Sequence, residues 1–301
     1  MNANKQCFSF FLVCLLVFRL GGFAQDKTAY QKEISEWDKK RAASLLAPDG
    51  WINLAGLYWL SAGINRFGSG MDNELVVSQK DIPVRVGNFN LVEGRVVWTT
   101  EAGVVVSVAD SLITCMTIYE DAKKVPLLAL GTWRWNIIKR DDKFGVRLRN
   151  LSSLALKQFA SIKRYPVNEK WKITAHLEPA NANGIAITNV LGQTNTQPSP
   201  GRLVFAINGQ TYRLDVFREG EQLFILFGDA TSGKETYAAG RFLYAAMPDA
   251  NGNTVLDFNK ALNPPCAFST YATCPLPPKQ NILPIAITAG EKDYLVKKGK
   301  G

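Results

Sequence analysis

The sequence is poor in the residues that most metal and redox enzymes depend on. It has one histidine, five cysteines and four methionines in 301 residues. One histidine excludes mechanisms that need two, which include most zinc hydrolase sites. No glycine motif that cradles a phosphate or a dinucleotide follows a predicted strand, and Gly68-Ser69-Gly70 lacks the spacing of a nucleophile elbow. We therefore predict no cofactor and no metal site, and the sequence alone discloses no reaction.

The chain also lacks long apolar runs and clustered charge. Hydrophobic residues make up 47% of it, charged residues 20% and aromatic residues 11%, which excludes a disordered chain or a disulfide-dense miniprotein. The basic residues are scattered, and the densest group is the terminal Lys297, Lys298 and Lys300. A nucleic-acid interface needs a basic stripe with aromatics among it, so we predict no nucleic-acid partner. No apolar run approaches the roughly 20 residues of a transmembrane helix, so we predict no membrane span.

Residues 1–24 resemble a secretory leader. They contain Lys5, the apolar run Phe8–Phe18 and the small residues that end at Ala24. A lipoprotein cut at Cys14 would leave almost no leader, so we place the cut after Ala24. Removal of Lys5 and Arg19, with no acid, lowers the net charge from +9 to +7. The sequence thus predicts an exported protein, periplasmic or secreted.

Loss of the leader leaves three cysteines: Cys115, Cys266 and Cys274. In an oxidising compartment, three thiols indicate one bridge and one free, buried residue. Cys266 and Cys274 are the natural pair, because they lie close in sequence among prolines. Cys115, within the apolar stretch Leu112–Ile118, is expected to be a small core residue.

The periodicity predicts one helix followed by a mainly β chain. Apolar residues recur at helical spacing over Thr28–Leu46, on the face of Tyr30, Ile34, Trp37 and Leu45, with Thr28 and Gln31 as a capping box. We expect this helical arm, residues 25–50, to pack its Trp37 face on the domain that follows. A partner-docking helix is the alternative.

The rest of the chain shows short strands and turns. Residues 51–155 predict a β-sandwich-like region. Residues 156–301 predict an antiparallel β-meander closed by a Pro-rich coil, with a two-residue hairpin turn at Asn208-Gly209 and another turn, at Asn251-Gly252, leading to Thr254–Phe258. The sequence leaves open whether the two β regions share one core.

A long C-terminal motif carries a family resemblance. It runs from Thr236 to Leu243, from Leu256 to Phe268, and on through Tyr271–Pro278, Asn281 and Ala289-Gly290-Glu291. This motif, together with Trp51–Leu60, closely resembles the bacterial and archaeal family DUF1684 over nearly all of the mature chain. The resemblance implies no substrate, cofactor or catalytic residue. A second, faint resemblance, to a forkhead-associated β-sandwich, rests on Ile64–Ser69, Asn73–Val77 and Gly131–Trp135. It would concern fold only.

The C-terminal motif is dense in polar groups that could hold a ligand. The candidates are Tyr237, Arg241, Asp257, Asn259, Asn263, Tyr271 and Glu291. These groups could simply pin a long coil by hydrogen bonding its backbone. The functional hypothesis is non-catalytic binding of a small or anionic ligand in the cell envelope, with Arg241 gripping the anion.

Two further classes of function remain open. One is a hydrolase or transferase that uses Cys266, with His176 as the one available base, or Asp257 and Glu291 as general acid and base. The other is a structural or partner-docking role for the Trp37 face. The spacing gives no sign that His176 and Cys266 meet.

Overall fold

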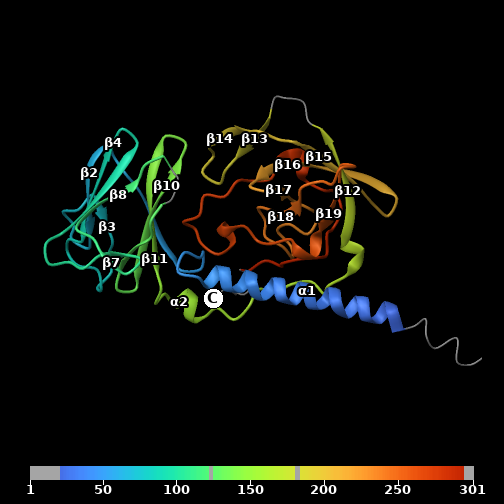
Figure 1. Cartoon of the computed structure of the whole chain (residues 1–301), viewed down its shortest axis with the longest axis horizontal. Coiled ribbons are helices and arrows are strands. Elements are labelled where there is room, and N and C mark those ends of the chain that lie inside the picture. Colours follow the sequence, from blue (N-terminus) through green and yellow to red (C-terminus); the bar gives the residue numbers. More distant parts are fainter. Residues whose placement is uncertain (1–20, 122–124, 180–183, 295–301) are drawn as a thin grey trace, which may run out of the picture.

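Two β lobes lie side by side, and one long helix runs along the lobe formed by the C-terminal half of the chain (Figure 1). The computed structural model describes residues 21–121, 125–179 and 184–294. Strands hold 44% of the residues and helices 13%, so the predicted mainly β fold class is confirmed. Within the described residues, no helix is long and apolar enough to cross a membrane.

The N-terminal lobe, residues 54–150, is a sandwich of two sheets. One sheet has the order β3-β2-β4-β5-β8 and the other β1-β11-β10-β9-β6-β7. The strands are β1 (Leu54–Trp59), β2 (Gly63–Gly68), β3 (Leu75–Val76), β4 (Gly87–Val92), β5 (Arg95–Thr100), β6 (Ser107–Val108), β7 (Ser111–Leu112), β8 (Cys115–Tyr119), β9 (Leu128–Leu130), β10 (Trp133–Arg140) and β11 (Lys143–Asn150). Alternate residues of these strands face inward, which puts Phe67, Phe89, Trp98 and Trp135 in one buried aromatic cluster. The rings of Trp98 and Trp135 lie 5.3 Å apart and join the two sheets.

The C-terminal lobe, residues 157–294, is built on a six-stranded sheet in the order β18-β17-β16-β15-β12-β19. Its strands are β12 (Lys172–Pro179), β15 (Gly201–Ile207), β16 (Gln210–Glu219), β17 (Gln222–Phe227), β18 (Arg241–Ala246) and β19 (Asn253–Asp257), and a separate ribbon pairs β13 (Ile185–Thr188) with β14 (Thr194–Gln197). The edge strands β18 and β19 lie close together, so the sheet curls into a nearly closed barrel. Its core is separate from that of the sandwich and includes Leu203, Leu214, Phe227 and Phe258.

The hairpin at Asn208-Gly209 is confirmed. Ile207 pairs with Gln210, and the two turn residues have φ of 52° and 79°. Positive φ at both positions matches the right-handed twist of the flanking strands, and Asn and Gly tolerate it best. The turn at Asn251-Gly252 is different: β19 does not pair with β18 but crosses to β12 and closes the barrel.

The helix α1 (Gly21–Leu46) begins earlier than predicted, so Thr28 lies inside it and is not its cap. Tyr30, Ile34 and Leu45 are buried as expected. The helix contacts the C-terminal lobe, however, more than 200 residues later, through Tyr30 with Asp257 and Arg41 with Glu291. Residues 1–20 of the expected leader lie outside the described residues.

Short helical turns connect and finish the lobes. α2 (Leu154–Lys157) connects the two lobes in sequence, and η1 (Glu169–Trp171) directly precedes β12. η2 (Phe258–Lys260), η3 (Pro265–Ala267) and η4 (Lys279–Asn281) belong to the Pro-rich coil. Asn281 pins this coil. Its buried side chain accepts from the amide of Asp215 at 2.7 Å and donates to the carbonyls of Asp215 and Leu226, both at 2.8 Å.

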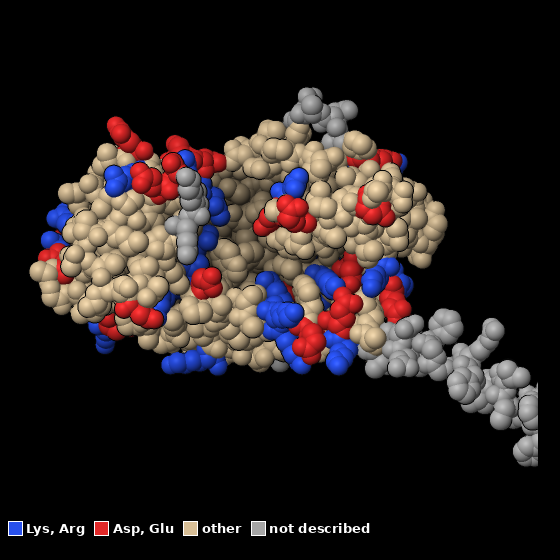
Figure 2. Space-filling view, viewed as in Figure 1, with Lys and Arg blue, Asp and Glu red and all other residues tan. Residues whose placement is uncertain are grey.

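The surface is hollowed between the two lobes, and Lys and Arg side chains gather along the N-terminal wall of the hollow (Figure 2). Few contacts cross it. Arg140 Nε donates to Thr273 Oγ1 at 2.9 Å, and Asn195 Nδ2 donates to Asp141. A surface hollow between two lobes is where ligands commonly bind.

Candidate functional site

The sequence-predicted residues divide into several networks rather than one pocket. Asp257 and Asn259 form the first, at the start of η2. The Tyr30 hydroxyl of α1 donates to Asp257 Oδ1 at 2.7 Å, and Asn259 Nδ2 donates to the Tyr30 oxygen at 2.9 Å and to the Asn168 carbonyl at 3.0 Å. Burial, reinforced by the Asp257 carboxylate, raises the pKa of Tyr30 well above its usual range. The phenol therefore keeps its proton and ties α1 to the lobe.

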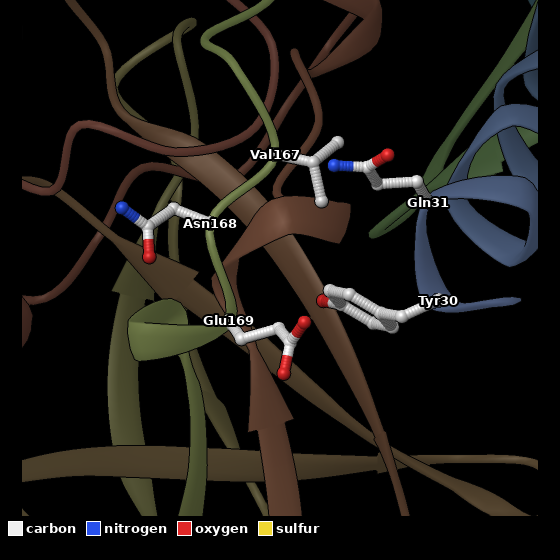
Figure 3. A pocket seen from close by; sticks show the side chains of 5 residues that line it. All are labelled: Tyr30, Gln31, Val167, Asn168 and Glu169. Atoms are coloured by element: carbon white, nitrogen blue, oxygen red, sulfur yellow. The ribbon is translucent and has the colours of Figure 1, made fainter. Parts of the chain in front are cut away.

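A pocket of about 380 Å³ opens beside this network, lined by Tyr30, Gln31, Val167, Asn168 and Glu169 (Figure 3). Its one charged side chain is Glu169, so it offers no grip for an anion. A second pocket of about 420 Å³ lies on the other side of Asp257, between α1 and the edges of the barrel. It is lined in part by Trp37, Lys172, Tyr244, Asp257 and Lys260.

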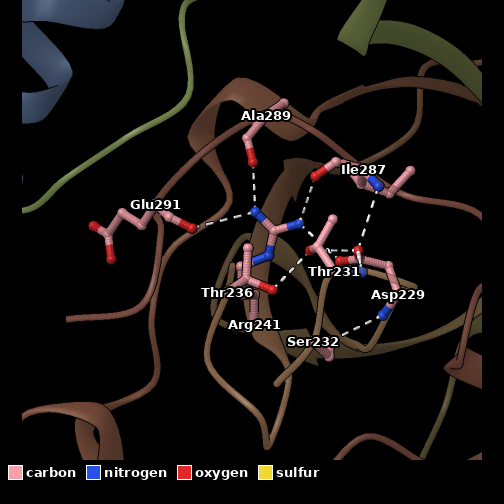
Figure 4. A network of polar contacts seen from close by, with 8 residues as sticks. All are labelled: Asp229, Thr231, Ser232, Thr236, Arg241, Ile287, Ala289 and Glu291. Atoms are coloured by element: carbon pink, nitrogen blue, oxygen red, sulfur yellow. Dashed lines mark hydrogen bonds and ion pairs between the residues drawn. The ribbon is translucent and has the colours of Figure 1, made fainter. Parts of the chain in front are cut away.

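Arg241 forms a second, fully buried network (Figure 4). Its Nη2 donates to Asp229 Oδ2 at 2.8 Å and to the Ile287 carbonyl at 3.0 Å, and its Nη1 donates to the Ala289 carbonyl. Burial lowers the pKa of Arg241, and Asp229 opposes that shift. The guanidinium thus closes the coil against β18 and has both terminal nitrogens taken by the protein.

Glu291 and Asn263 are joined by an arginine of α1. Arg41 Nε donates to Glu291 Oε1 at 3.1 Å, while the amide of Asn263 donates to Oε2 at 2.6 Å. Arg41 Nη2 also donates to the Asn263 carbonyl at 2.9 Å. Asp257 and Glu291 therefore sit in separate networks, each carboxylate held by its own partners.

The remaining candidates lie on the side of the coil that faces the other lobe. Tyr271 is exposed, and Tyr237 is half-buried. Burial, and then the nearby thiols of Cys266 and Cys274, raise the pKa of Tyr237. These two cysteines are free thiols in the structure, so the predicted bridge is not formed there.

Cys115 does not lie in the core, where the sequence predicts it. It is exposed and free, not a core residue. β8 is an edge strand, and its alternation buries Ile118 while Cys115 faces outward. The apolar stretch around Cys115 correctly predicts a strand, but the prediction that Cys115 faces the core is wrong.

A different cluster, which the sequence analysis missed, lies on the wall of the hollow. In the β10–β11 ladder, Arg134 pairs with Arg149, Asn136 with Arg147, and Arg140 with Lys143. Directly paired residues share a sheet face, and the opposite face carries the core residues Trp135, Val146 and Leu148. We call Arg134, Arg140, Arg147 and Arg149 the arginine face.

The arginine face has no carboxylate partner. Every other described arginine forms an ion pair with Asp or Glu: Arg41, Arg66, Arg85, Arg95, Arg164, Arg202, Arg213, Arg218 and Arg241. The four on this face form none within the described residues. Arg149 donates instead to the Gly50 carbonyl and to Asn136 Oδ1, and Arg140 to Thr273. Among the described residues, the arginines without an ion pair are thus all on this one sheet face.

Of the four arginines, Arg147 differs most from an ordinary surface arginine. It is 7% exposed, its Nε and Nη2 have no hydrogen-bond partner within the described residues, and its guanidinium lies over the Trp51 ring at 4.6 Å. Burial, and then the charges of Arg149 and Arg140, lower the pKa of Arg147 to about 10. Burial also lowers the pKa of Arg149 to about 10, with Asp49 opposing the shift. At neutral pH both guanidinium groups therefore stay charged, and neither forms an ion pair within the described residues.

The sequence holds a weak signal for this face. In Val146-Arg147-Leu148-Arg149, arginines alternate with buried apolar residues, which is the pattern of a strand with one cationic face. The pattern cannot show that no carboxylate forms an ion pair with these arginines, because most of the other described arginines pair with acids more than ten residues away.

Fold and site together define a two-lobed, mainly β protein with a cationic wall between its lobes. Residues 157–292 match the model of DUF1684, a protein family of unknown function. The resemblance is confirmed over the C-terminal lobe, and the Trp51–Leu60 signature lies outside the matched residues. No curated protein matches the chain.

Two solved structures resemble parts of the chain. One is the solution NMR structure of the uncharacterized protein from gene locus rrnAC0354 of Haloarcula marismortui. It is 28% identical, with 45% of this chain and 78% of that chain covered and a TM-score of 0.39. The other comes from a structural and functional analysis of phosphothreonine-dependent FHA domain interactions. It is 12% identical, with 31% of this chain and 92% of that chain covered and a TM-score of 0.22. At these TM-scores neither likeness carries an argument about function.

Proposed function

We propose that this protein binds a small anionic ligand, a carboxylate or a phosphate, at the arginine face between its lobes. The observation that carries the proposal is that the four arginines of the arginine face form no ion pair within the described residues, while every other described arginine forms one. A buried charge without a partner lowers the stability of the fold, and proteins retain such charges mainly at sites where a ligand of opposite charge binds. Arg241 is a weaker candidate, because Asp229 and three backbone carbonyls occupy its terminal nitrogens.

The geometry of Arg147 favours an oxyanion. Nε and Nη2 lie on one edge of the planar guanidinium, and this edge forms two parallel hydrogen bonds to a carboxylate or a phosphate. Both atoms are without a partner. Trp51, under the same guanidinium, holds the plane in place. The ligand would thus bind to a guanidinium edge that is held in one orientation, and Arg149 and Arg140 would add positive charge nearby.

The test is anion titration of the chain that starts at Gln25, with inorganic phosphate and citrate as probes at constant ionic strength. We expect at least one probe to bind and to raise the thermal transition. Arg147→Met and Arg149→Met should each weaken binding roughly 10-fold or more, since a hydrogen bond to a charged group contributes about 1.5–3 kcal/mol. Arg213→Met, which removes an exposed arginine paired with Glu178, is the matched control and should bind like wild type.

Two results would contradict the proposal. One is the absence of any shift with both probes in wild type. The other is equal weakening by Arg147→Met and Arg213→Met, since this would reduce the effect to general screening of a basic protein.

We also propose that the protein is exported and cleaved after Ala24, as its leader-like segment suggests. The side chains of α1 that contact the C-terminal lobe, among them Tyr30, Glu33 and Arg41, lie after this cut, which would leave their contacts intact. Mass spectrometry of the N-terminal peptide from the envelope fraction should find Gln25 first. A chain that retains Met1, or that remains with the cytoplasm, would contradict export.

A further inference from the structure

We infer that Cys266 and Cys274 form a redox-active dithiol that exchanges with small-molecule disulfides, with Cys266 as the attacking thiol and Cys274 as the resolving thiol. The inference rests on the geometry of the pair and is independent of anion binding at the arginine face. It assigns chemistry to the one pair of thiols that the described chain brings together.

The coil holds the two sulfurs against each other from both sides. The amide of Cys266 donates to Cys274 Sγ at 3.1 Å, and the amide of Cys274 donates to Cys266 Sγ at 3.2 Å. This reciprocal pairing fixes both cysteines at the ends of one loop. Each sulfur therefore has an N–H donor already in place, and such donors favour the thiolate over the thiol.

The two thiols are unequal in the way that thiol–disulfide exchange requires. Cys266 is partly exposed, whereas Cys274 is 5% exposed. The hydrogen bond with the Cys274 thiol lowers the pKa of Cys266 in spite of its burial. The bond with Cys266, together with burial, raises the pKa of Cys274, and Arg147 acts weakly in the opposite direction. The more exposed and more acidic thiol, that of Cys266, thus lies beside the protected thiol of Cys274.

The exchange balances without any group beyond an external disulfide. The Cys266 thiolate attacks one sulfur of the disulfide, which forms a mixed disulfide and releases the other half as a thiolate. Cys274 then loses its proton to water and attacks Cys266 Sγ. The Cys266–Cys274 bond forms, and the second half leaves as a thiolate. Two protein thiols are oxidised by two electrons, and the external disulfide is reduced to two thiols.

The experiment uses the chain from Gln25 in buffers of glutathione and glutathione disulfide. The reaction is quenched with acid, the free thiols are alkylated, and the tryptic peptides are weighed. One peptide, residues 261–279, carries both cysteines, and Cys115 lies on another. We expect the 261–279 peptide to lose both labels as the buffer becomes oxidising and to regain both when it is reduced.

Single variants separate the roles of the two cysteines. Cys274→Ser should accumulate a glutathione adduct on Cys266, because the resolving thiol is gone. Cys266→Ser should form its adduct on Cys274 at least about 10-fold more slowly, because thiolate fraction and access govern the rate. Cys115→Ser should behave like wild type. Far-ultraviolet circular dichroism shows whether each variant keeps its strands.

Three results would overturn the inference. The first is a wild-type protein that stops at a mixed disulfide or does not react. The second is equal adduct rates on Cys266→Ser and Cys274→Ser. The third is a bridge that excess reduced glutathione cannot open, since this would make the pair a permanent staple.

Discussion

At the scale of single residues, two buried arginines of this chain have different roles: one is structural, and the other is proposed to bind a ligand. Arg241 is 1% exposed and paired with Asp229 at 2.8 Å. Arg147 is 7% exposed and has no acid. A structural charge has a partner of opposite charge within the fold. A charge that binds a ligand has no such partner in the unliganded protein, which is therefore less stable. Substitution by methionine, which has a similar length, should therefore move stability in opposite directions.

Arg241→Met should destabilise the protein. It leaves the Asp229 carboxylate buried without its cation, and breaking one side of a buried pair costs about 3–5 kcal/mol. Urea unfolding at pH 7 measures the loss. The double variant Arg241→Met/Asp229→Asn should recover part of it, because it also removes the orphaned charge. Stability equal to wild type would show that the pair does not hold the coil.

Arg147→Met should stabilise the unliganded protein. Folding lowers the pKa of Arg147 from its usual range to about 10. At 1.36 kcal/mol per unit this is a penalty of roughly 3 kcal/mol as an upper bound, and loss of the Trp51 contact returns about 1 kcal/mol. We expect a net gain of roughly 1–2 kcal/mol in urea at pH 7. A loss of stability would indicate that Arg147 is structural.

The pH dependence of that gain follows from linkage. The unfolded chain holds the Arg147 proton more tightly than the native chain does, so native stability rises with pH between about 10 and 12.5. Below pH 10 the penalty is complete. The advantage of Arg147→Met over wild type should thus be constant from pH 7 to 9 and should shrink above pH 10. Unfolding curves at pH 7, 9 and 10.5 would show this, and an advantage that grows with pH would contradict it.

At the scale of elements, α1 shows what periodicity can and cannot predict. Tyr30, Ile34 and Leu45 were expected on one buried face, and they are buried. The spacing holds no information on which lobe they meet, since that depends on Asp257 and Glu291, far along the chain. The Asn208-Gly209 hairpin was predictable because all its determinants are local. The pairing of β19 with β12 was not, because barrel closure is a long-range event.

Tyr30→Phe tests how α1 is attached. It removes the hydroxyl that donates to Asp257 and accepts from Asn259. Two buried polar groups then lose a partner, so we expect a loss of about 1–3 kcal/mol. Tyr212→Phe is the control and should lose less, because it removes a hydroxyl that has no hydrogen bond to the described residues and leaves the ring on Phe205. Equal losses would mean that ring packing, and not the hydroxyl network, attaches the helix.

At the scale of the whole molecule, the sandwich and the barrel have separate cores. Sequence reasoning could outline the two β regions, but it could not place the arginine face. That face exists because strand register brings the cations of β10 and β11 together and because no described acid forms an ion pair with its arginines. The site is thus a property of how the lobes meet, which no local pattern encodes.

Because the two lobes have separate cores, we expect them to unfold separately. Hydrogen exchange measured in increasing urea should show two protection midpoints, one for peptides from β4 and β5 and one for peptides from β15 to β17. Arg241→Met should lower only the second, because its contacts lie within the C-terminal lobe. Phe67→Leu, in the aromatic cluster of the sandwich, should lower only the first. If either variant moves both midpoints equally, the lobes unfold as one unit. The wall between them is then a rigid surface, and an anion bound there stabilises the whole chain and not the N-terminal lobe alone.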